Sequence, residues 1–204
     1  MASQVSHIIY ARKYFEKNPA LPNFEDEFVL GCVFPDIRRI DESIKRKDTH
    51  RCFSPLDLNF LGLSPFQAGW KFHLYCDMKR EEILNKYKFY EIPGTADFWH
   101  QSAKQLEDEI LYEEYNNWEK IVHYFNNIPR IEIGADVTYE TFQLWYAIIA
   151  KYIEKKTDNK SAHIFLSKQL SWAEKADDIM KSVDNLRKNE KVMEILKKVK
   201  DEII

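Results

Sequence analysis

The segment from Ser64 to about Lys88 constrains the fold most, because it predicts one long helix that is apolar on nearly every side. Ser64 followed by Pro65 is typical of a helix N-cap with proline at the first helical position, and "EIPG" follows the segment. Apolar side chains in "AGWKFHLYCDM" surround the axis almost completely. The first half of this helix is therefore predicted to be buried.

The rest of the chain also predicts helices and no sheet. It has only 5 glycines and 7 prolines, apolar residues recur at helical spacing, and alternating strand patterns are missing. We expect an all-α, single-domain multi-helix bundle over residues 1–204, with a metal-site half at about 1–90 and a helical remainder at about 91–204. The other expected helices lie at about 3–17, in a short segment ended by Pro35, at 95–128 with a break near 112–116, and at 138–156, 160–184 and 187–203.

Charge and composition exclude several classes of protein. With 30 basic and 33 acidic residues, the net charge of -3 provides no general field that attracts nucleic acid, so we expect no stable nucleic-acid binding. No window approaches the ~18 apolar residues of a membrane span, and the first residues do not resemble a signal peptide. Three cysteines are too few for a disulfide framework. The sequence predicts a cytoplasmic protein without a transmembrane segment.

Two hydrophilic residues, His73 and Asp77, lie one helical turn apart on the buried half of this long helix. A buried carboxylate without a partner is costly, so Asp77 requires a cation, a set of donors or a metal. Gly69, one turn earlier, would let another backbone or a ligand come close. One interpretation is a core histidine hydrogen-bonded to its aspartate, and the other is a metal site.

Four short elements favour the metal site because of their order. His7 lies in the first helix, "GCVFPD" ends at Asp36, "TH" ends at His50, and "GWKFHLYCD" contains His73 and Asp77. Over roughly the first 80 residues this order resembles the zinc-dependent phospholipase C family, which is related to single-strand-specific zinc nucleases. The resemblance implies a helical fold and a metal-dependent hydrolase that acts on phosphate esters.

Transferred by position, the resemblance also implies a ligand set. His50, His73 and Asp77 would hold one zinc, and His7 would hold a second ion that Asp77 bridges, while Asp36 would be the general base or an additional ligand. Imidazoles and carboxylates suit zinc or a similar divalent ion, which brings a bound water to a pKa near ~7. Two such ions ~4 Å apart clamp the attacking and leaving oxygens of a phosphate ester.

The chain departs from the family at two points. Secreted family members use their processed N-terminal residue as a ligand, whereas this sequence places six residues before His7. Family members also bind a third zinc through later residues, and Ile83 stands where the first of its histidines is expected. We therefore expect one or two ions, with Glu81, His100 and Glu107 as candidates for a supplementary site.

The connection between Asp36 and His50 carries a local excess of positive charge. If this loop covers the metals, Arg38, Arg39 and Arg51 would hold substrate phosphate oxygens by bidentate contacts. The alternative is a solvated loop or a short exposed helix.

Three hypotheses for function follow. The first is a metal-dependent hydrolase of a small-molecule or lipid phosphate ester, similar to a phospholipase C phosphodiesterase, that uses a metal-activated water. The second is a non-catalytic helical protein with a structural metal site or a binding or scaffold role. The third, a phosphohydrolase of the HD type, ranks last because the adjacent His-Asp pair of that class does not occur in the sequence.

Overall fold

Two helices cross at two glycines near the centre of the fold. The computed structural model describes residues 2–50, 53–133 and 135–204. The helices are α2 (Pro22–Val33) and α4 (Pro65–Lys86). A Cβ on Gly31 would lie 2.0 Å from the Phe66 carbonyl oxygen, and one on Gly69 would lie 1.9 Å from that of Phe28. The close approach expected at Gly69 is therefore made by the backbone of α2.

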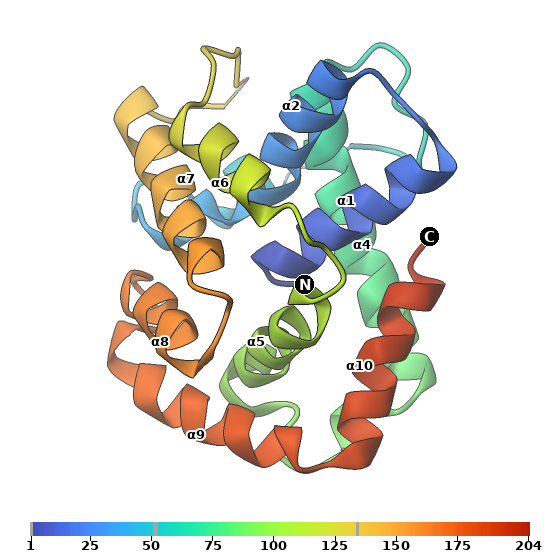
Figure 1. The fold of residues 1–204 in the computed structure, drawn as a ribbon, viewed down its shortest axis with the longest axis vertical. Coiled ribbons are helices and arrows are strands. Elements are labelled where there is room, and N and C mark those ends of the chain that lie inside the picture. The colour runs from blue at the N-terminus through green and yellow to red at the C-terminus, as the bar shows by residue number, and fades with distance from the viewer. Residues whose placement is uncertain (1, 51–52, 134) are drawn as a thin grey trace.

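Two helices from different parts of the sequence lie beside this crossing. Helix α1 (Gln4–Lys17) packs against α2 and α4, and its first turn meets α5 (Asp97–Tyr112), as the blue and green ribbons of Figure 1 show. The 3-10 helix η1 (Phe34–Arg39) continues from α2, and the short α3 (Arg46–Thr49) packs against it. Residues from 34 to 50 thus approach the same region as α1 and α4.

The remaining helices surround α5 and the glycine crossing (Figure 1). Helix α7 packs on α6 and α8, α9 packs on α5, and α10 contacts both α4 and α5. These elements are η2 (Phe89–Glu91), α6 (Trp118–Asn126), α7 (Tyr139–Glu154), α8 (Asn159–Ser167), η3 (Ala173–Lys175), α9 (Ala176–Arg187) and α10 (Glu190–Glu202). The described residues contain no strand, which confirms the all-α prediction. None of their helices combines the length and apolarity required to cross a membrane.

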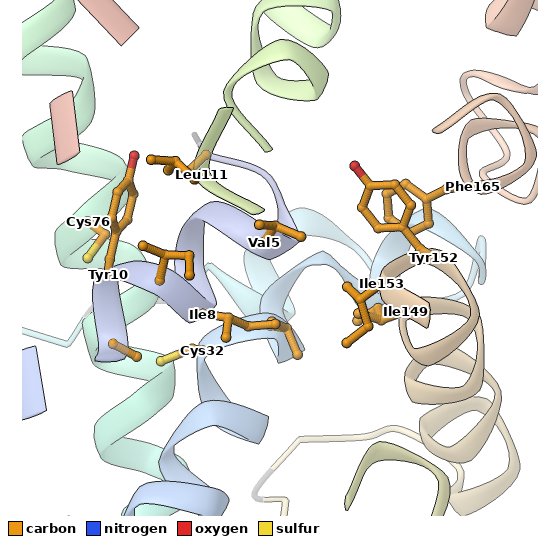
Figure 2. Close-up of a cluster of buried hydrophobic side chains, with 14 of the residues drawn as sticks. Val5, Ile8, Tyr10, Cys32, Cys76, Leu111, Ile149, Tyr152, Ile153 and Phe165 are labelled. Atoms are coloured by element: carbon orange, nitrogen blue, oxygen red, sulfur yellow. The ribbon is translucent and has the colours of Figure 1, made fainter. Parts of the chain in front are cut away.

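The hydrophobic core runs through α1 and joins the two sides of the bundle. Val5 and Ile8 of α1 are fully buried, with Tyr10 beside Cys76 of α4 toward one side. Toward the other side, Tyr152 and Phe165 stack at a ring-centroid distance of 4.4 Å (Figure 2). Apolar contact area of this kind is the main source of stability in a bundle.

The predicted helix starts at Ser64 and Thr138 are confirmed. Their side chains accept hydrogen bonds from the backbone N–H groups of Gln67 and Thr141, respectively, and Pro65 occupies the first turn. The helix expected from about 95 begins at Asp97, and Thr95 does not cap it, because the Thr95 hydroxyl donates to the carbonyls of the preceding turn and the first residues of α5 are kinked. The single helix expected at 160–184 is wrong, because α8 ends at Ser167 and α9 begins only at Ala176.

Candidate metal centre

The crossing of α2 and α4 fixes the orientation of His73. The His73 ring is buried, and its Nδ1 lies 2.7 Å from the Cys32 carbonyl oxygen at the end of α2. Because a carbonyl oxygen only accepts, Nδ1 carries the proton, and Nε2 of the neutral ring keeps its lone pair. A backbone acceptor on one ring nitrogen is the usual arrangement of a metal-binding histidine.

His7, His73 and Asp77 form a buried cluster, which we call the His–Asp cluster. Their ligand atoms all lie within 4.8 Å of one another. His7 Nε2 is 3.3 Å from Asp77 Oδ1, and His73 Nε2 is 3.4 Å from Asp77 Oδ2. Ligands of one zinc stand about 2.0–2.2 Å from it, so two of them lie up to about 4 Å apart. The atoms of the cluster are close to that spacing, and the residues fit a divalent ion.

Three of the four imidazole nitrogens in the cluster make no hydrogen bond to the residues that the structure describes. Within the described residues, both ring nitrogens of His7 and Nε2 of His73 make no hydrogen bond, although all are buried. Buried polar atoms in proteins almost always have a partner, so such a group indicates an ion or water. Burial, followed by the influence of His73, lowers the pKa of His7 to about 4. His7 is therefore neutral at pH 7, as a metal ligand must be.

The two rings of the cluster face different oxygens of the same carboxylate. The His7 and His73 rings stack with centroids 3.8 Å apart and planes inclined by 17°. An imidazole lone pair lies in the plane of its ring, so two nearly parallel rings direct their lone pairs along separate, adjacent lines. Asp77 Oδ1 lies on the His7 side and Oδ2 on the His73 side. Each ring thus faces its own Asp77 oxygen, and Oδ1 also accepts from the Ala2 N–H at 2.6 Å.

His50 lies next to the cluster but outside it. It follows α3 directly, its ring is 5.7 Å from the His73 ring at 85°, and its Nε2 is buried without a hydrogen bond to described residues. Trp70 Nε1 donates to the carbonyl of Thr49, and the Thr49 hydroxyl lies 3.1 Å from His50 Nδ1. Burial, followed by the influence of His73, lowers the pKa of His50 to about 3.

Asp36 also borders the cluster, and it is held by polar partners. Gln4 Nε2 donates to Oδ2 at 2.9 Å, and Arg39 is 2.8 Å from the same oxygen. Burial raises the pKa of Asp36, but the charge of Arg39 and the influence of His73 and His50 hold it well below its usual range. The carboxylate is therefore ionised and a weak proton acceptor, which suits a ligand better than a general base.

Arg38 and Arg39 connect Asp36 to a pocket of about 360 Å³. Arg39 is fixed by the amide oxygens of Gln101 and Gln169, at 3.3 and 3.1 Å. Arg38 is more exposed, lies 3.9 Å from Asp36 Oδ1, and keeps an unpartnered Nε among the described residues. We call this the arginine pocket, and it is lined by Arg38, Arg39, Trp99, Gln101, Ser171, Trp172 and Lys175.

The other residues singled out in the sequence lie elsewhere. Arg51 falls outside the described residues. Glu81 and His100 are separated by Tyr90, whose hydroxyl donates to Glu81 at 2.8 Å and whose ring packs 4.2 Å from that of His100. Glu107 is buried against Arg80, with 2.7 Å between Arg80 Nε and the carboxylate. Among the described residues these three do not gather their ligand atoms in one place.

Helix α5 contributes polar residues that sequence reasoning missed. Every residue from 101 to 108 is buried. Asp108 accepts from the backbone N–H and hydroxyl of Ser6, and so caps the helix that carries His7. Lys104 is 2% exposed, and burial, followed by the charge of Arg39, lowers its pKa to about 7. The sequence gives no apolar signal for this burial, because most residues of "QSAKQLEDEI" are polar.

No protein-family model, curated protein or solved structure matches this chain.

Proposed function

We propose that this protein is a metal-dependent hydrolase of phosphate esters. The observation that carries the proposal is the His–Asp cluster, in which both nitrogens of His7 and Nε2 of His73 are buried next to a carboxylate and make no hydrogen bond to described residues. The order of His7, Asp36, His50, His73 and Asp77 in the chain, which resembles the zinc-dependent phospholipase C family, supports the same class of reaction.

Two divalent ions, most simply zinc, would share the carboxylate of Asp77. His73 and His50 would hold one ion and His7 the other, since the two stacked rings face different Asp77 oxygens. Zinc at such a site supplies a nucleophilic water near neutral pH and polarises a phosphoryl oxygen. Burial keeps His7 neutral, and the charge of Arg39 keeps Asp36 ionised, which are the forms that bind a metal.

The two arginines have different roles in this proposal. Arg39, fixed by two glutamine amides, holds Asp36 in place. Arg38, whose side chain lines the pocket, would donate to the phosphate oxygens of the substrate. Lys104 is buried, and its burial and the charge of Arg39 lower its pKa to about 7, so it is only partly charged at neutral pH.

A structural metal site is the second candidate. It is favoured by the complete burial of His7 and His73, because a closed site has four protein ligands and no room for substrate. The arginine pocket supports the hydrolase, because a hydrolase of phosphate esters requires a phosphate-binding group near its metal.

The test combines metal content with activity. Protein purified without added metal, and then loaded with zinc, is assayed with a chromogenic phosphodiester and a phosphomonoester. His73→Gln and Asp77→Asn should lose metal and at least about a hundredfold of the activity. His163→Gln is the matched control. His163 of α8 is partly exposed and pairs with Asp177 of α9 at 3.0 Å.

Three outcomes are informative. Metal and activity that disappear together support the hydrolase. Metal bound through these residues without any hydrolysis favours the structural site. Full activity in the metal-free variants contradicts the proposal.

A further inference from the structure

A second cavity lies between α7 and α8, on the left of Figure 1 and apart from the arginine pocket. Its volume of about 640 Å³ falls within the range of about 300–1,000 Å³ typical of small-molecule sites. The floor is apolar and comes from both helices: Ala147, Ile148, Ile164 and Phe165, with Tyr152 stacked on Phe165 (Figure 2). Ile164 is 46% exposed, so the floor keeps apolar surface in contact with solvent.

The rim of this cavity is positively charged, although the protein as a whole carries a net charge of -3. Its four lysines are Lys151, Lys155, Lys160 and Lys168. Lys151 pairs with Glu154 at 2.6 Å, whereas the other three make no ion pair with the residues that the structure describes. The one rim carboxylate, Asp158, accepts from the Ser161 N–H at 2.8 Å and caps α8.

We propose that this groove binds a single-chain amphiphile with an anionic head group, such as a long-chain carboxylate. The apolar floor takes the chain, and the lysines without ion-pair partners take the head group. A carboxylate needs such charge-assisted contacts, and a chain buried on the floor removes Ile148 and Ile164 from water. The proposal does not depend on the metal site.

Calorimetric titration of the protein with decanoate and dodecanoate, below their micelle concentrations, tests the proposal. Affinity should rise about fourfold for each added methylene. Dodecanoate should bind at least about tenfold more tightly than its methyl ester, because the ester lacks the charge that the lysines recognise.

Two variants separate the groove from general charge effects. Lys155→Glu with Lys168→Glu should weaken dodecanoate binding about tenfold or more. Lys191→Glu with Lys197→Glu, two exposed lysines of α10, makes the same change of charge and should leave the affinity within about twofold. Ile164→Gln, an exposed position that folding tolerates, should also weaken binding.

Several results would overturn the proposal. One is equal affinity for the acid and its ester, and another is an equal loss of dodecanoate affinity in the two double lysine variants. A third is binding of the acid only when it is embedded in vesicles. Preference for an acidic amphipathic helical peptide over dodecanoate would assign the groove to a protein partner instead.

Discussion

The Nδ1 atom of His73 lies 2.7 Å from the carbonyl oxygen of Cys32, across the closest contact between α2 and α4. This hydrogen bond is possible because Gly31 and Gly69 let the two backbones touch. It leaves the Nε2 lone pair of His73 directed at Asp77. The packing of two helices thus determines which ring nitrogen is available to a metal.

Gly69→Ala should destabilise the protein, although alanine is normally the better helix former by about 1 kcal/mol. The new Cβ would lie 1.9 Å from the Phe28 carbonyl oxygen, so the helices must separate, and overpacking of this kind typically costs about 1–3 kcal/mol. Urea unfolding measures the loss, and zinc affinity should fall with it as Cys32 moves from His73. Higher stability in the variant would show that the crossing is not tight.

Arg38→Met should lower kcat/KM for a phosphodiester by about tenfold to a hundredfold and leave bound metal unchanged. The reason is that Arg38 donates to the phosphate in our proposal but does not touch the His–Asp cluster. Lys175→Met, which removes another cation that lines the pocket, serves as the comparison and should have a smaller effect. Metal lost from Arg38→Met would instead give Arg38 a role in supporting Asp36.

The stability of the metal-free protein should fall as the pH drops from about 6.5 to about 4. Burial lowers the folded-state pKa of His7 to about 4 and that of His50 to about 3, so only the unfolded chain takes up these two protons in that window. Each such group contributes a slope of up to about 1.4 kcal/mol per pH unit. Asp108 acts in the opposite direction, because burial raises its pKa to about 6 and the folded state is protonated first.

His7→Gln isolates the His7 contribution to this pH dependence. The variant lacks one of the two titrating histidines, so its stability should decline less steeply than that of the wild-type protein between pH 6.5 and 4. Urea unfolding in the presence of a chelator, at several pH values, gives both curves. Parallel curves would mean that His7 is not buried in its neutral form.

Arg80→Met should be among the most destabilising substitutions outside the cluster. Arg80 and Glu107 are both fully buried, with 2.6 Å between Arg80 Nη2 and Glu107 Oε2, and Tyr10 also donates to Glu107. Removing one partner of a buried pair typically costs about 3–5 kcal/mol, because the other charge remains without compensation. The double variant Arg80→Met with Glu107→Gln should recover part of the loss, and strictly additive losses would show that the two charges do not interact.

Helices α4 and α5 show how far the sequence predicts this structure. The cap at Ser64, the buried first half of α4 and the all-α fold follow from local chemistry and apolar spacing. In α5, by contrast, residues 101–108 are buried although most of them are polar. Their burial depends on partners from distant segments, such as Ser6 for Asp108 and Arg39 for Gln101, and apolar periodicity contains no information about such partners.

The candidate site was predictable in composition but not in arrangement. The sequence indicates His7, His73 and Asp77 as ligands, and the structure brings these three together. The sequence does not indicate that α2 supplies the hydrogen bond to His73, or that Gln4 and Arg39 hold Asp36. These contacts arise from the glycine crossing and from η1, which are set by tertiary packing.

The most direct test of the account is an anomalous difference map, measured at the zinc absorption edge, from crystals of the zinc-loaded protein. We expect density bounded by His7 Nε2, His73 Nε2 and the two oxygens of Asp77. A map without density there, or with zinc bound only at other residues, would contradict the claim that a metal ion accounts for this buried group of side chains.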